Sequence, residues 1–154
     1  MTILGIRTST KEIRYAILDF HQDESAVLLN SESENRLRFP ASHDTTAKKL
    51  WWFYQELERI IRQNQPIAKI MVKPSEYGGS DSIASRTASY IEGVIYTYAG
   101  KADIPIDAKT YRTMKTCRKN VKSFAENNVG KTRINWNEQM ADAVAVAFVG
   151  GIEK

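Results

Sequence analysis

The order of apolar runs along the chain constrains its fold more than any other feature. Two β-rich runs, ILGI at 3–6 and IRYAILDF at 13–20, are separated by a short polar turn, which is typical of an antiparallel hairpin. A segment with helical spacing follows at 42–64, and the apolar run IAKIMV at 67–72 predicts a buried strand. Such an order favours a mixed sheet with helices on its faces.

The second half of the chain continues this alternation. A helix is predicted over 80–100, beginning at Ser80 or Asp81, and a short strand over 104–108. Within that helix Gly93 lowers helix stability, so we expect another backbone to approach it closely. The last predicted helix, over 137–151, is rich in small apolar residues.

The chain shows no internal repeat, low-complexity tract or linker that would divide it. Short β-rich runs at 25–31 and 36–39 extend the hairpin. We therefore expect a single α/β domain over residues 1–154. Its mixed five-stranded sheet would have the antiparallel hairpin strands first and helices on both faces.

The first long helix carries the candidate for a subunit contact. Ser42 or Asp44 can cap its start. Trp52 falls on the polar side of the helical pattern and is predicted to be exposed, where it would contact either a neighbouring loop or a partner subunit. The residues predicted to form the buried face are Leu50, Tyr54, Leu57 and Ile61.

Positive charge is concentrated after the predicted strand at 104–108. The formal net charge of the chain is +4, and such a cluster can bind nucleic-acid phosphates, the alternative being a solvated surface. Tyr111 and Trp136 flank this region, where they would stack on bases or pack in the core. The predicted nucleic-acid-binding residues, which we call the basic segment, are Lys109, Arg112, Lys115, Arg118, Lys119 and Lys122.

Asp142 interrupts the apolar stretch MADAVAVAF at 140–148. A carboxylate beside a tightly packed interface loses hydration and needs a metal, a cation or several hydrogen bonds. Glu138, one turn earlier, would share a ligand with it. The alternative is that Asp142 is solvated at the rim of the interface.

Several motifs, in order, resemble those of RuvC-like Holliday-junction resolvases and other RNase H-like proteins. ILGIRTST resembles their first strand, IMVKPSEYGG their fourth strand, and SRTASYIEGVIYTYAG the helix that follows. PIDAKTYRTMKTC is similar to their basic segment, and NEQMADAVAVAFVG to their last helix. In that family three or four carboxylates bind two divalent cations, usually magnesium or manganese, which activate a water.

The chain departs from this family pattern at the carboxylate positions. The first-strand aspartate corresponds to Arg7, the strand glutamate to Lys73, and the acid before the final aspartate to Gln139; only Asp142 matches. We expect the two cations to point toward Asp142 and replace the metal charge. At about 4 Å each would interact with a unit charge by roughly 4 kcal/mol at an effective dielectric of 20.

The resemblance therefore implies a catalytically inactive domain that binds DNA or RNA, with no catalytic residue and no metal cofactor. A first alternative is a divergent magnesium- or manganese-dependent endonuclease that uses the displaced carboxylates Glu76, Glu138 and Asp142. A second is a protein-interaction module that kept only the fold. The resemblance is also compatible with a homodimer.

Other features bear on location and on small ligands. No signal segment or membrane-spanning run is present, and the one cysteine, Cys117, excludes an internal disulfide. We therefore expect a cytoplasmic protein without a membrane partner. Gly78 and Gly79 favour a plain turn over a phosphate-binding loop.

Overall fold

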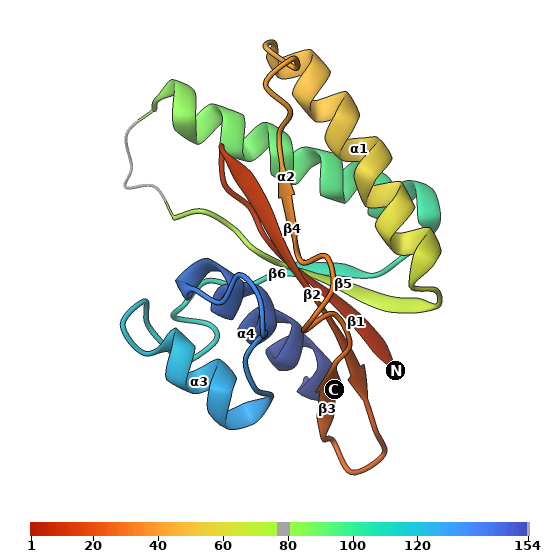
Figure 1. Cartoon of the computed structure of the whole chain (residues 1–154), viewed down its shortest axis with the longest axis vertical. Coiled ribbons are helices and arrows are strands. Elements are labelled where there is room, and N and C mark those ends of the chain that lie inside the picture. The colour runs from red at the N-terminus through yellow and green to blue at the C-terminus, as the bar shows by residue number, and fades with distance from the viewer. Residues whose placement is uncertain (77–80, 154) are drawn as a thin grey trace.

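The computed structural model describes residues 1–76 and 81–153. One mixed sheet lies at its centre, with strand order β3-β2-β1-β5-β6 and with β4 also paired to β2 (Figure 1). β1 is antiparallel to β2 and parallel to β5, and β5 is parallel to β6. The strands are β1 (Thr2–Arg7), β2 (Glu12–Phe20), β3 (Ala26–Leu28), β4 (Arg36–Arg38), β5 (Ile67–Lys73) and β6 (Ile106–Ala108).

This sheet confirms the predicted mixed α/β fold with its antiparallel hairpin strands first. β3 and β4 pair with different parts of β2, so the two short strands share one position beside it. The sheet therefore has six strands where five were predicted, and these six strands occupy five positions across the sheet.

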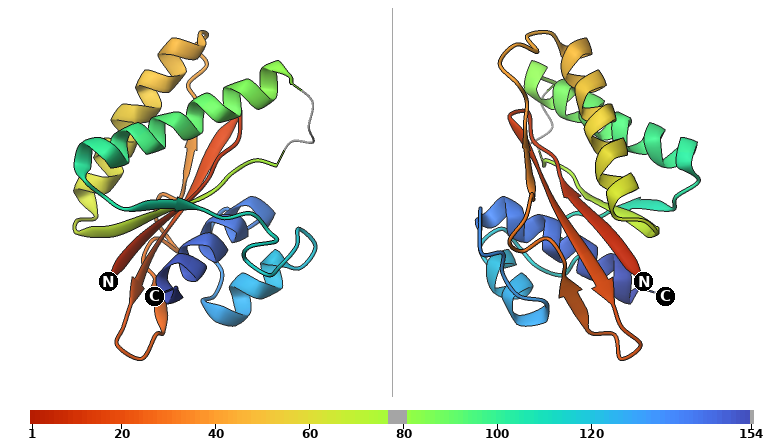
Figure 2. Two further views of the ribbon diagram at one scale, coloured as in Figure 1. Left: turned by 180° about the vertical axis from the view of Figure 1, so that it is seen from behind. Right: turned by 45° about the vertical axis from the view of Figure 1, so that its right-hand side comes forward.

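Helices cover both faces of the sheet (Figure 2). One hydrophobic cluster includes residues of α1 and α2, and a second includes residues of α3 and α4. No helix in the described part of the chain is long and apolar enough to cross a membrane. The helices are α1 (Thr46–Gln63), α2 (Ile83–Ala102), α3 (Val121–Asn128) and α4 (Glu138–Ile152).

The first two helices begin later than predicted. The Thr45 side chain caps α1, so neither Ser42 nor Asp44 does. Ser82 caps α2 and forms a reciprocal capping box with Ser85, so Asp81 does not. The predicted cap Ser80 and the turn glycines at 78–79 lie outside the described residues.

Helix α4 lies directly against β1, which the small residues of its sequence permit. A Cβ added to Gly5 would lie 2.2 Å from the Ala143 carbonyl oxygen and 2.7 Å from the Ala147 Cβ. This close approach brings the start of α4 over the carboxyl ends of β1 and β5. The close approach expected at Gly93 was wrong, since an added Cβ there meets nothing within 4 Å.

Trp52 is less exposed than predicted, and it contacts a neighbouring loop, which was the first of the two alternatives. Its ring is half-buried, with centroids 5.5 Å from Phe39 and 6.3 Å from His43, because the segment between β4 and α1 folds over it. Trp51 is the exposed tryptophan, with 61% of its surface accessible and its ring stacked on Tyr54. Helical periodicity cannot reveal such a contact, because the loop lies outside the helix.

Candidate functional site

The site is built at the carboxyl ends of two parallel strands. Arg7 ends β1 and Lys73 ends β5, and the two residues are paired in register. Both side chains therefore leave the sheet on the same face, the one that α4 covers. This placement follows from the parallel pairing of β1 and β5, which their local sequences do not specify.

Arg7 forms an ion pair with Asp142 of α4. Its Nε donates to Asp142 Oδ2 at 2.8 Å, and its Nη1 donates to Ser75 Oγ at 2.8 Å and to the Thr8 carbonyl oxygen. The Asp142 side chain is 1% exposed and that of Arg7 is 15% exposed. The pair is thus largely removed from water, and each partner depends on the other for compensation.

The second oxygen of Asp142 is engaged as well. The Tyr111 hydroxyl donates to Oδ1 at 2.8 Å. Burial raises the pKa of Asp142, while the hydrogen bonds from Tyr111 and Arg7 and the charge of Lys73 oppose that rise. Burial and the bond to Asp142 raise the pKa of the Tyr111 hydroxyl. Sequence reasoning gave Tyr111 only stacking or core packing, because no local signal links it to a residue on a distant helix.

Lys73 is the second buried cation of the site, with 1% of its side chain exposed. Its Nζ lies 3.3 Å from Glu76 Oε2 and donates to the Pro74 carbonyl oxygen at 3.0 Å. It also lies 4.1 Å from the centroid of the Tyr111 ring, within cation–π range. Burial lowers the pKa of Lys73, and the charges of Asp142 and Glu76 oppose this.

These groups open into a pocket of about 190 Å³, which we call the strand-end pocket. Glu138 does not share a ligand with Asp142 but pairs with Arg118 at 2.6 Å. On α2, burial raises the pKa of Glu92, while Arg7 and Lys73 oppose the rise. The lining residues are Arg7, Lys73, Glu76, Tyr111, Arg118, Glu138 and Gln139.

The basic segment lies between β6 and α3 and extends into α3, and its members differ in how they are engaged. Lys109 is 18% exposed and pairs with Asp107 and Glu153, at 3.1 and 2.9 Å, so it is held by internal partners. Trp136 donates from its indole nitrogen to Glu126 and packs beside the cluster around α4. The exposed members are Arg112, Lys115, Arg118, Lys119 and Lys122.

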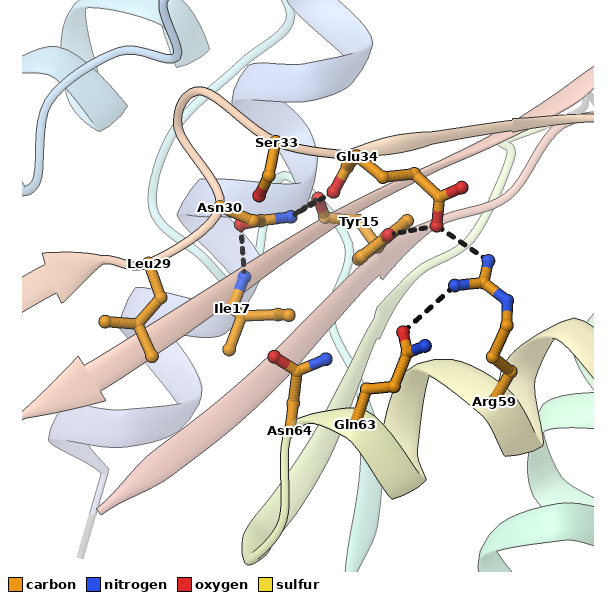
Figure 3. Close-up of a pocket in the computed structure, with 9 residues that line it drawn as sticks. All are labelled: Tyr15, Ile17, Leu29, Asn30, Ser33, Glu34, Arg59, Gln63 and Asn64. Carbon is orange, nitrogen blue, oxygen red and sulfur yellow. Dashed lines mark hydrogen bonds and ion pairs between the residues drawn. The ribbon is translucent and has the colours of Figure 1, made fainter.

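A separate pocket of about 260 Å³ lies between β2 and the end of α1 (Figure 3). There Glu34 accepts from the Tyr15 hydroxyl at 2.6 Å and from Arg59 at 2.7 Å. Asn30 accepts from the Ile17 backbone nitrogen and donates to the Tyr15 and Glu34 carbonyl oxygens. The charged and amide side chains of this pocket thus have hydrogen-bond partners within the protein, which is typical of a structural polar network.

No family model matches the chain, and no curated protein matches its sequence. Solved structures do match. RuvC of Thermus thermophilus is 14% identical with a TM-score of 0.77, covering 96% of this chain and 92% of that one. The fold is RuvC-like.

Two further resolvases share the fold. The yeast mitochondrial Holliday junction resolvase is 13% identical with a TM-score of 0.61, covering 95% of this chain and 77% of that one. The Fowlpox virus resolvase, solved with Holliday junction DNA, is 12% identical with a TM-score of 0.57, covering 98% and 97%. These matches confirm the resemblance to RuvC-like resolvases at the level of the fold.

The comparisons correct the prediction that no metal cofactor is involved. The neighbours with the RuvC-like fold are resolvases that use divalent metal ions, so the expectation of no cofactor was wrong. That expectation relied on the departures from the family pattern at Arg7, Lys73 and Gln139.

The side chains present do not fit a carboxylate site for two ions in the arrangement observed. Both oxygens of Asp142 are bonded, one to Arg7 and one to Tyr111. Lys73 stands at the end of β5, where the family resemblance implies a glutamate. Within residues 1–76 and 81–153, no group of three or more His, Cys, Asp or Glu side chains is placed to hold a metal ion.

Proposed function

We propose that this chain is a nucleic-acid-binding domain with a RuvC-like fold that does not cleave its ligand. The observation that carries the proposal is the pairing of Asp142 with Arg7 and Tyr111 at 2.8 Å each. The carboxylate of the last helix thus has protein partners for both oxygens. A nuclease of this fold would need that carboxylate free to act.

The exposed part of the basic segment supports binding. Inside the strand-end pocket, Arg7, Lys73 and Arg118 are each paired with a carboxylate, that of Asp142, Glu76 or Glu138. The positive excess beside the pocket therefore comes from the exposed cations Arg112, Lys115, Lys119 and Lys122. Clustered cations of this kind bind phosphates by releasing counterions, which makes the affinity depend on salt.

The test is a binding and cleavage assay on one set of ligands. Fluorescently labelled four-way junction, duplex and single-stranded DNA, and the corresponding RNAs, are titrated with the protein in increasing salt, with magnesium or manganese present. We expect salt-sensitive binding and intact strands. Absence of binding to every ligand at low salt would refute the proposal and favour a protein-interaction module.

A matched pair of variants locates the binding surface. The first replaces Arg112, Lys115, Lys119 and Lys122 with alanine, and we expect it to lose most of the affinity. The control removes the same charge from the opposite face by replacing Lys48, Arg62, Arg86 and Lys101, which are 60 to 71% exposed on α1 and α2. Equal losses in both variants would show that binding is only a general charge effect.

A metal-dependent nuclease is the second candidate, favoured by the structural match to Holliday junction resolvases. It requires the Arg7–Asp142 pair to open and Glu76 or Glu138 to turn from Lys73 or Arg118. Cleavage that depends on magnesium or manganese and disappears in Asp142→Asn would establish it and overturn the binding-only proposal.

A further inference from the structure

A second pocket adjoins the strand-end pocket. It has a volume of about 400 Å³, and Gln139 at the start of α4 lines both. We call it the turn pocket because two of its residues, Ser9 and Lys11, belong to the turn between β1 and β2. Its remaining lining residues are Glu12, Arg38, Phe39 and Gln139.

The sheet register places cations in a row beside these pockets. Residues directly opposite each other on paired strands point to the same face of a sheet. Arg7 on β1 is in register with Arg14 on β2 and with Lys73 on β5, and Arg14 is in register with Arg36 on β4. The row therefore crosses four strands on the face covered by α4. Asp142, Glu12 and Glu76 compensate Arg7, Arg14 and Lys73, so the charge available to a polyanion is that of the exposed cations Lys11 and Arg38 at the end of the row.

The turn pocket offers exposed groups of its own. The Arg38 side chain is 69% exposed, and Lys11 is exposed. Among the described residues that line it, Glu12 carries a carboxylate, which is compensated by Arg14 at 2.7 Å and Arg38 at 3.4 Å. Phe39 is half-buried and packs against the hydrophobic cluster that includes residues of α1 and α2, with ring centroids 5.5 Å from Trp52 and 6.5 Å from Phe53, so it reaches the turn pocket as a fixed part of its wall.

We propose that a nucleic-acid strand in the strand-end pocket continues over Gln139 into the turn pocket, which is a second subsite for a phosphate-linked nucleotide. Lys11 and Arg38 contact the phosphates, and Phe39 receives a base on its ring. Aromatic rings beside a basic groove are the usual platform for unpaired bases. This inference rests on the proposed function, to which it adds the path of the strand.

The variant Lys11→Ala/Arg38→Ala tests the path. We expect its affinity for single-stranded DNA to fall about fivefold at low salt, and the slope of log affinity against log salt to become shallower by about 1.4, because two phosphate contacts are lost. The control is Lys48→Ala/Arg62→Ala on α1. Arg62 is 71% exposed and also pairs with a glutamate, so it matches Arg38 in exposure and pairing.

Photo-crosslinking of the wild-type protein to a strand that contains bromouracil gives an independent readout. We expect the crosslinked peptide to contain Phe39. Suppose that the wild type binds, that the variant of the basic segment loses affinity, and that the Lys11/Arg38 variant keeps the wild-type affinity and salt slope. The turn pocket is then not a subsite, and the proposed function stands. If the wild type binds no nucleic acid, the proposed function fails and the inference with it.

Discussion

At the scale of single residues, Asp142 compensates one largely buried cation, Arg7, and one fully buried cation, Lys73. Arg7 donates a hydrogen bond to Asp142 directly. Lys73 interacts electrostatically with the same carboxylate, and only 1% of the lysine side chain is exposed. Removing one partner of a buried pair leaves the other charge without compensation, which costs more than the pair contributes. Asp142 is therefore expected to matter for stability whether or not it matters for activity.

Asp142→Ala should lower the free energy of unfolding by about 3 kcal/mol, as for the loss of one member of a buried ion pair. Urea denaturation followed by circular dichroism measures this. Asp19→Ala is the control, because Asp19 is 37% exposed and pairs with the amino terminus, and little change is expected. An Asp142 variant as stable as the wild type would show that the pair does not stabilise the strand ends.

The lowered pKa of Lys73 predicts a pH dependence. Between its folded-state pKa and the ordinary lysine value the unfolded chain binds more protons, so stability contributed at this position rises with pH. The stability of wild type relative to Lys73→Met should therefore increase as pH is raised toward the ordinary lysine pKa. Paired urea titrations across the alkaline range measure the difference, and a constant or falling difference would mean that Lys73 is not desolvated.

At the scale of secondary-structure elements, the contact between β1 and α4 positions the site. Asp142 reaches Arg7 because α4 lies so close to β1 that Gly5 has no room for a side chain. A residue with a Cβ at this position would push the helix away from the strand. The geometry of the ion pair thus depends on a glycine two residues before Arg7.

Gly5→Ala should destabilise the protein by about 3 kcal/mol, because overpacking forces backbone to move. Gly93→Ala is the matched control, since its added Cβ meets no atom within 4 Å and alanine favours a helix by about 0.5–1 kcal/mol. Thermal melts should shift in opposite directions for the two variants. A Gly5 variant that melts with the wild type would contradict the close packing of α4 on β1.

At the scale of the whole molecule, the two faces of the sheet differ in the groups that they bury. The face under α1 and α2 holds one hydrophobic cluster, and the face under α4 holds another together with the buried ion pair. The exposed cations Arg112, Lys115, Lys119 and Lys122 belong to the segment on the α4 side. If nucleic acid binds through these cations, its affinity should fall with salt, because each phosphate contact releases counterions.

The wild-type affinity for single-stranded DNA should fall with a slope of log affinity against log salt between about −3 and −4, as for four to six phosphate contacts. Fluorescence anisotropy at several salt concentrations measures it. A slope near zero would mean that the cations make no phosphate contacts.

Sequence patterns alone were enough to predict the order of strands and helices and to single out Asp142 as a carboxylate within an apolar helix, but they left open whether it is buried or solvated. Both predictions depend on periodicity and residue type, which are local properties. The folded arrangement was needed to show that Asp142 is buried, that Tyr111 and Arg7 share it, and that Glu138 binds Arg118. Those partners are distant along the chain, and the pairing of strands and packing of helices that bring them together leave no local pattern.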